Sequence, residues 1–123
     1  MKLAEHAIAA SQRAVCAVSN FPVGAAVQAA DGRVFEGCNV ESPSLLHVVC
    51  AERVALLAAL SAGAREIEAI AVHAPKRADI TPCGLCLQMI AEFAPAARIL
   101  LVADRKNVRE VSLADLLPNA FRL

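Results

Sequence analysis

Three cysteines and one glutamate are the residues of this chain whose types and spacing suit catalysis. Glu52 follows Cys50 by two positions, and Cys83 and Cys86 form a Cys-x-x-Cys motif further along the chain. Three thiolates can hold a zinc ion and leave its fourth coordination position open for water, and a carboxylate that is not a ligand can move the protons of that water. These residues therefore predict a hydrolytic zinc site.

Both cysteine motifs are expected at the start of helices. Cys50 opens a predicted helix that ends near Gly63, and Cys83 and Cys86 open a second predicted helix over Gly84–Phe93. Side chains three positions apart project from the same side of a helix, and the unpaired backbone N–H groups of a first turn lower the pKa of a thiol. Two helix starts are therefore expected to converge on one metal.

Two neighbours of Cys50 extend this hypothesis. Glu52 is predicted as the general base that takes a proton from the metal-bound water, and Arg53 as a cation that hydrogen-bonds the sulfurs and withdraws charge from them. The alternatives are a glutamate that only complements the helix dipole and an arginine on the helix surface. His47 or His73 could also supply a fourth ligand, which would close the site and make it structural.

Composition limits the classes of function. The chain has 123 residues, the size of a single domain over residues 1–123, and it is 58% hydrophobic and 20% charged, so we expect some apolar surface to lie between subunits. Basic and acidic residues number 12 each, which leaves no positive excess for a nucleic acid polymer or an anionic membrane. The apolar stretch between Arg53 and Arg65 is too short to span a bilayer. A soluble, cytoplasmic protein is expected.

The five cysteines are an odd number, and three of them follow a metal-binding pattern and not a disulfide framework. Cys16 and Cys38 remain outside this pattern. Both lie in apolar surroundings, so we expect them to be buried as small apolar side chains.

Hydrophobic periodicity predicts an α/β fold. An amphipathic helix is expected over Leu3–Val18, and Ile67–His73 and Ile99–Ala103 read as a parallel pair of strands joined by a crossover helix. The other predicted elements are a hairpin of strands over Val23–Ala30 and Arg33–Val40, a loop over Glu41–Val49, a short strand over Val108–Val111 and a last helical turn after Ser112. We expect a mixed sheet with helices on both faces.

Several segments together resemble a known family. SNFPVGAAV, GCNVE, VCAERVALLAAL, PCGLCLQMIAEF and DLLPNAF are similar, in order and spacing, to the small homotetrameric zinc-dependent cytidine deaminases. The resemblance implies a three-layer α-β-α fold with a mixed central sheet of about five strands. It also implies one zinc ion per subunit and a role in pyrimidine salvage. The implied reaction is hydrolysis of free cytidine or deoxycytidine at C4, which gives uridine or deoxyuridine and ammonia.

The same resemblance implies roles for further residues. Asn39 and Glu41 correspond to residues that hydrogen-bond the ribose hydroxyl, and Phe21 to the aromatic residue that packs on the pyrimidine. The backbone of Ala51 would contact the base, and Phe121 would reach into the site of a neighbouring subunit. Core packing is the alternative role for both phenylalanines.

The chain departs from the family pattern around the sugar. The segment Ser42–His47 stands where the family usually has Asn-Ala followed by a tyrosine. Val15 and Val18 occupy positions where the family tends to have tyrosines, and Leu87 occupies a position that is commonly arginine. This altered loop, with Leu45 near its centre, motivates a second hypothesis: deamination of a modified cytosine nucleoside, as in the related blasticidin S deaminases. A non-enzymatic structural zinc-binding module is the third.

Overall fold

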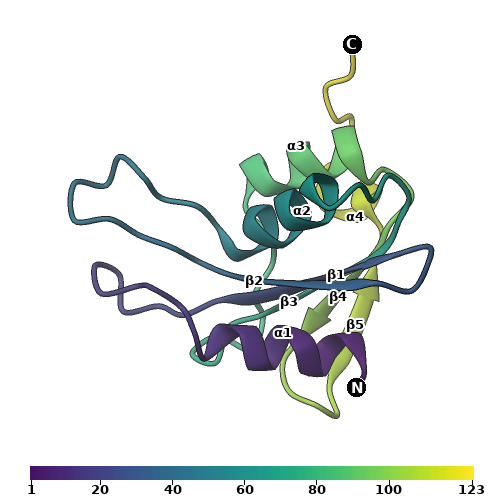
Figure 1. Ribbon diagram of the computed structural model, residues 1–123. Coiled ribbons are helices and arrows are strands. Elements are labelled where there is room, and N and C mark those ends of the chain that lie inside the picture. The colour runs from purple at the N-terminus through teal and green to yellow at the C-terminus, as the bar shows by residue number, and fades with distance from the viewer.

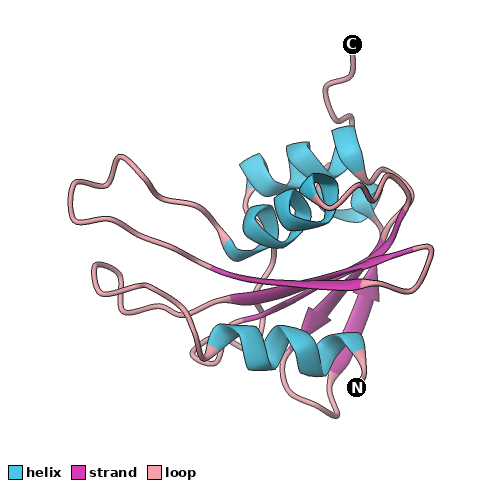
Figure 2. Ribbon diagram, in the orientation of Figure 1, coloured by secondary structure: helices cyan, strands magenta, loops and turns pink.

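A five-stranded mixed sheet lies between two layers of helices in the computed structural model, which describes residues 1–123 (Figure 1, Figure 2). The four helices are α1 (Leu3–Ser11), α2 (Ala51–Ser61), α3 (Gly84–Phe93) and α4 (Leu113–Leu116). The five strands are β1 (Gly24–Ala29), β2 (Val34–Cys38), β3 (Ile67–His73), β4 (Arg98–Val102) and β5 (Val108–Val111). The predicted α/β class and three-layer architecture are confirmed.

The strands lie in the order β2-β1-β3-β4-β5. β1 pairs antiparallel with both β2 and β3, and β5 pairs antiparallel with β4. β3 and β4 are parallel, with Ile70 opposite Ile99, and α3 lies between them in the chain. The predicted parallel pair with its crossover helix is therefore present.

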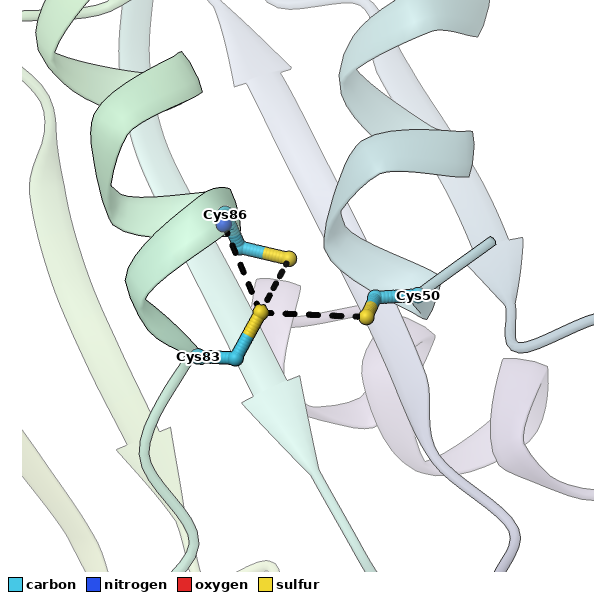
Figure 3. Close-up of side chains that lie close together, drawn as sticks. All are labelled: Cys50, Cys83 and Cys86. Carbon is cyan, nitrogen blue, oxygen red and sulfur yellow. Dashed lines mark hydrogen bonds between the residues drawn. The ribbon is translucent and has the colours of Figure 1, made fainter. Parts of the chain in front are cut away.

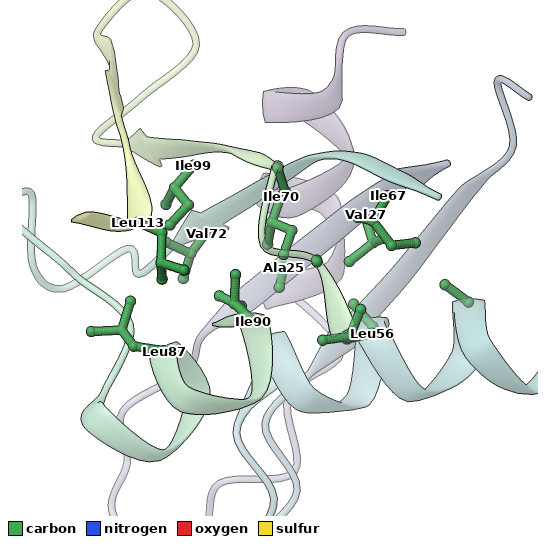
Figure 4. Close-up of a cluster of buried hydrophobic side chains, with 14 of the residues drawn as sticks. Ala25, Val27, Leu56, Ile67, Ile70, Val72, Leu87, Ile90, Ile99 and Leu113 are labelled. Atoms are coloured by element: carbon green, nitrogen blue, oxygen red, sulfur yellow. The ribbon is translucent and has the colours of Figure 1, made fainter. Parts of the chain in front are cut away.

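Two hydrophobic layers hold the helices to the sheet. The larger one lies between the sheet and helices α2, α3 and α4, and its largest fully buried side chains include Leu56, Ile90 and Ile99 (Figure 4). The smaller one lies under α1 and consists mostly of alanines, among them Ala7 and Ala26. Small side chains let the backbones approach closely, so both helix layers are fixed tightly to the sheet.

Gly37 sets the position of α2. A Cβ atom at Gly37 would lie 2.4 Å from the Ala55 nitrogen and 2.7 Å from the Ala51 carbonyl oxygen. The backbone of α2 therefore rests directly on β2, at a place where only glycine leaves room. This contact places the N-terminus of α2, which carries Cys50 and Glu52.

The prediction of a first helix as far as Val18 is wrong, because α1 ends at Ser11. Beyond this point the backbone pairs with the segment after β2: the Val15 N–H donates to the Asn39 carbonyl at 2.9 Å, and the Glu41 N–H donates to the Val15 carbonyl at 2.8 Å. These tertiary hydrogen bonds outweigh the local apolar periodicity.

Cys16 and Cys38 are only half-buried, so the prediction that both are buried is also wrong. The Cys38 thiol donates a hydrogen bond to the Arg13 carbonyl at 3.4 Å. All five cysteines are free thiols. None of the four helices combines the length and the apolar character needed to cross a bilayer.

Candidate active site and metal centre

The three cysteines of the two motifs converge between the N-termini of α2 and α3 (Figure 3). The Cys83 Sγ lies 3.9 Å from the Cys50 Sγ and 3.4 Å from the Cys86 Sγ, and all three sulfurs lie within 4.8 Å of one another. Tetrahedral zinc with Zn–S bonds of about 2.3 Å places its sulfur ligands about 3.8 Å apart. The sulfurs therefore stand at a separation that suits one zinc ion.

Local helix geometry explains this convergence. Cys50 is the N-cap of α2 and Cys83 is the N-cap of α3, and each has an extended backbone conformation. The Cys86 N–H donates to the Cys83 Sγ at 3.4 Å, so the first turn of α3 holds its own two cysteines together. At the start of α3, unpaired N–H groups and the positive end of the helix dipole favour ionised sulfur at Cys83.

The two cysteines of α3 differ in acidity. Burial raises the pKa of the Cys83 thiol, but hydrogen bonds from the Cys86 N–H and its neighbours outweigh burial, so the net pKa lies below the ordinary value. Burial and then the negative charge of Glu52 raise the pKa of the Cys86 thiol. A set of three sulfurs crowded beside a carboxylate suits a doubly charged cation, because the cation offsets their mutual repulsion.

Arg53 brings a positive charge to the sulfurs, as the sequence suggested. Its Nη2 lies 3.7 Å from the Cys50 Sγ. Burial lowers the pKa of this guanidinium, but hydrogen bonds to the thiols of Cys50 and Cys86 raise it, and the net pKa lies above the ordinary value. Its Nε is buried without a hydrogen-bond partner, so the side chain gives up solvation to stay beside the cluster.

Glu52 lies in the first turn of α2 and is only 5% exposed. Burial raises the pKa of its carboxyl group above the ordinary value, and a hydrogen bond from its own backbone N–H and the charge of Arg53 oppose this only in part. A buried carboxylate beside three thiols is a costly arrangement. An ordinary helix-capping glutamate would be exposed to solvent.

A cleft of about 420 Å³ opens in front of the cluster. Its wall includes most of the residues that the sequence singled out: Phe21, Asn39, Glu41, Cys50, Ala51, Glu52 and Cys83. Ser19, Val23, Val48, Val49, Ile80 and Thr81 complete it. The volume suits a small molecule and the lining mixes apolar and polar groups, as in typical ligand sites.

The Asn39 side-chain amide hydrogen-bonds the backbone of the segment that carries Phe21. Its Nδ2 donates to the Phe21 carbonyl and its Oδ1 accepts from the Val23 N–H, both at 2.9 Å. A side-chain amide has two donors and two acceptor lone pairs, so one of each remains for a ligand. The predicted contact of Asn39 with a sugar hydroxyl stays a prediction.

Phe121 does not line this cleft. It is 68% exposed, on the C-terminal tail that runs beyond α3 (Figure 1). Gln88 of α3 donates to the Phe121 carbonyl at 3.0 Å and Arg122 donates to the Ala91 carbonyl at 3.4 Å, so the tail is held along the helix. Core packing, the alternative role for Phe121, does not occur within the chain.

Neither candidate histidine joins the sulfurs. His47 is exposed in the loop before Cys50, and the ring of buried His73 donates from Nδ1 to the Val102 carbonyl at 2.9 Å. The potential metal ligands that cluster here are Cys50, Cys83 and Cys86 alone. The protein side chains therefore leave a fourth coordination position open, which is the pattern of catalytic zinc sites.

Comparison with known proteins agrees with this geometry. The family model described as the zinc-binding region of cytidine and deoxycytidylate deaminases matches residues 1–102. The chain belongs to this family. The cytidine deaminase of Sporosarcina psychrophila is 40% identical over 121 residues, which cover 98% of this chain and 89% of that protein. The family prediction is confirmed, and with it the zinc cofactor and the enzyme class, a zinc-dependent deaminase.

Solved structures of the family share the whole fold. The 1.6 Å crystal structure of cytidine deaminase from Burkholderia pseudomallei superposes with a TM-score of 0.89 at 46% identity, and the match covers 97% of this chain and 96% of that one. A blasticidin-S deaminase from Bacillus cereus is a more distant relative, 29% identical over 78% of this chain and 74% of its own length.

Proposed function

We propose that this chain deaminates free cytidine or deoxycytidine by hydrolysis at C4, with uridine or deoxyuridine and ammonia as products. One observation carries the proposal: the buried carboxylate of Glu52 and two residues of the three-sulfur cluster, Cys50 and Cys83, line a cleft of about 420 Å³ together with Phe21 and Glu41. A buried acid–base group beside an open metal position supports hydrolysis, and the size of the cleft supports a small substrate.

Cys50, Cys83 and Cys86 would hold one zinc ion per subunit, which when bound supplies a Lewis acid that activates water at neutral pH. Glu52 takes a proton from the attacking water and gives it to the pyrimidine N3 as the C4–O bond forms. It then carries the second proton of the water to the exocyclic amine. The C4–N bond breaks, and the amine leaves as ammonia.

The other cleft residues would bind and orient the nucleoside. Phe21 packs against the pyrimidine ring, and the backbone of buried Ala51 contacts the base at the start of α2. The Glu41 carboxylate accepts a hydrogen bond from a ribose hydroxyl, and the Asn39 amide donates or accepts through the donor and the lone pair that its internal hydrogen bonds leave free. Arg53 offsets the negative charge of the three sulfurs.

A panel of cytosine nucleosides tests this assignment. The zinc-loaded protein is mixed with cytidine, deoxycytidine and modified cytosine nucleosides such as blasticidin S, and ammonia release is measured. We expect cytidine or deoxycytidine to have the highest kcat/KM. Preference for a modified nucleoside would favour the second hypothesis, and inactivity on the whole panel despite bound zinc would favour a non-enzymatic zinc module.

The second hypothesis rests on the altered loop before Cys50. Leu45 has a left-handed backbone conformation with φ of 63° and is 60% exposed, and the backbone groups of Val40 and Val49 pair at the base of the loop. The blasticidin-S deaminase of Bacillus cereus is 29% identical to this chain, whereas the cytidine deaminase of Sporosarcina psychrophila is 40% identical. Cytidine therefore remains the better supported substrate.

We also infer a homotetramer of single-domain subunits, each formed by residues 1–123, that works in the cytoplasm in pyrimidine salvage. The exposed apolar side chains Val15, Val18, Leu45, Leu46 and Phe121 support the assembly, because burial between subunits would remove them from water. Five unpaired thiols are in keeping with a reducing compartment.

A further inference from the structure

Ser19 connects two other residues of the cleft wall, Glu41 and Phe21. Its hydroxyl donates to Glu41 Oε2 at 2.6 Å and accepts a hydrogen bond from the Phe21 N–H at 3.1 Å. Its own backbone N–H donates to Glu41 Oε1 at 3.0 Å. A single serine therefore contacts both oxygens of one carboxylate and the backbone of the neighbouring aromatic residue.

These hydrogen bonds fix the orientation of the Glu41 carboxylate. A carboxylate on a flexible side chain normally rotates, whereas two donors from one residue hold both of its oxygens in a defined plane. Each oxygen keeps a free lone pair, and the cleft lies in front of the group. The Glu41 carboxylate is therefore set to accept a hydrogen bond from a ligand hydroxyl.

We propose that Ser19 is a positioning residue, which aims the Glu41 carboxylate at a hydroxyl group of the sugar and ties that contact to the placement of Phe21 against the base. The inference rests on the proposed function and assigns the sugar-recognition part of the same site. Because Ser19 acts through the Glu41 carboxylate, it affects how tightly a sugar with hydroxyl groups is bound.

The ionisation of Glu41 agrees with this role. Hydrogen bonds from the Ser19 hydroxyl and then from the Ser19 backbone lower the pKa of the Glu41 carboxyl group below its ordinary value. The group is thus an acceptor only at neutral pH, and its natural ligand partner is a donor such as a sugar hydroxyl.

Other contacts hold the segment around Ser19, so removal of the hydroxyl should not unfold it. Lys76 Nζ donates to the Asn20 carbonyl at 2.6 Å, and Asn39 binds the backbone on both sides of Pro22 through Phe21 and Val23. Ser19 itself is exposed, so a Ser19→Thr substitution has room for the added methyl group while it keeps the hydroxyl.

The test measures binding without turnover. Zinc-loaded protein in a Glu52→Gln background is titrated calorimetrically with cytidine and with 2′,3′-dideoxycytidine, which lacks the 2′ and 3′ hydroxyls of the ribose. Ser19→Ala should weaken cytidine binding about five- to tenfold, which is within the range for the loss of one ordinary hydrogen bond. Binding of the dideoxy nucleoside should change by less than about twofold. Ser19→Thr should restore cytidine binding. The matched control is Ser61→Ala, which removes the hydroxyl of an exposed serine at the end of α2 and should leave cytidine binding unchanged.

The outcomes separate this inference from the proposed function. An equal loss of affinity for both nucleosides would show a merely structural role for Ser19, and no loss for cytidine would show that it does not position Glu41; either result overturns the inference. If the zinc-loaded parent binds neither nucleoside, the proposed substrate class is itself wrong, and the assignment of Ser19 falls with it.

Discussion

At the scale of single residues, the site gathers groups that are negative when ionised, and two of them, Glu52 and Cys86, are buried. Three thiols and the Glu52 carboxylate lie together, and Arg53 is the cation whose guanidinium reaches the sulfurs. Three thiolates alone would weaken a metal as a Lewis acid by donating too much charge. The guanidinium counters this through hydrogen bonds to Cys50 and Cys86, so Arg53 should affect the rate more than the fold.

Replacement of Arg53 by Gln tests this balance. We expect kcat to fall about 10- to 100-fold, as is common when a partner of a metal ligand is removed. Zinc content by atomic emission and the far-UV circular dichroism spectrum should show whether metal and fold are retained. Arg105→Gln, an exposed arginine in the turn between β4 and β5, is the matched control. Wild-type turnover in Arg53→Gln would contradict the role of its charge.

Sequence reasoning identified the residues that carry local signals and missed those that act through tertiary contacts. Cys50, Glu52, Cys83 and Cys86 are spaced as metal and acid–base groups at helix starts, so their convergence could be predicted. Ser19 has no such signal, because its hydrogen-bond partner Glu41 lies in a different segment of the chain. The backbone contacts of the Asn39 amide were missed for the same reason.

At the scale of elements, the site depends on where two helices begin. α2 reaches its position because Gly37 lets its backbone lie against β2, and α3 is the helix of the crossover between β3 and β4. Both helices pack on the same face of the sheet (Figure 1). A small displacement of α2 would therefore move Cys50 relative to Cys83 and disturb the cluster of three sulfurs.

Gly37→Ala should displace α2. A Cβ atom 2.4 Å from backbone cannot be accommodated without movement, so we expect a loss of about 2–3 kcal/mol in the free energy of unfolding and weaker zinc retention. Urea denaturation and competition with a chelator measure the two effects. For Gly84→Ala, the added Cβ meets nothing within 4 Å, so stability should change by less than about 1 kcal/mol. Equal stability of the two variants would contradict the close contact.

Most elements could be predicted because their hydrophobic periodicity agrees with their tertiary environment. The parallel pair β3 and β4 reads as continuous apolar sequence, and the hairpin of β1 and β2 carries an Asp-Gly turn with Gly32 at φ of 94°. The end of α1 could not be predicted. Its apolar pattern continues toward Val18, yet Val15 gives its backbone hydrogen bonds to the segment after β2.

At the scale of the whole molecule, the chain exposes apolar groups away from its own core. Leu46 is 80% exposed, Phe121 is 68% exposed and Val15 is 53% exposed. Leu46 lies in the loop before α2 and Phe121 on the C-terminal tail, and both segments extend from the body of the molecule (Figure 1). Side chains in such positions suit contacts between subunits.

Light scattering of the protein in solution should give a mass four times that of the 12.9 kDa chain.

Phe121→Ala should lower kcat/KM about tenfold with unchanged zinc content, since the Phe121 side chain would contribute to the cleft of a neighbouring subunit and not to that of its own subunit. Subunits with Phe121→Ala mixed with Glu52→Gln subunits should then show more activity than the sum of the two alone. A mass of one chain, or no complementation, would contradict a shared site.

The role of Glu52 is tested by comparing ammonia release from cytidine by the zinc-loaded wild-type protein and by its Glu52→Gln variant, with zinc content measured for both. The amide cannot accept and return protons, so we predict turnover by the wild-type protein and a loss of at least about 1,000-fold in the variant, with zinc retained. Near wild-type turnover in the variant, or no ammonia from the wild-type protein despite bound zinc, would contradict the assignment of this site.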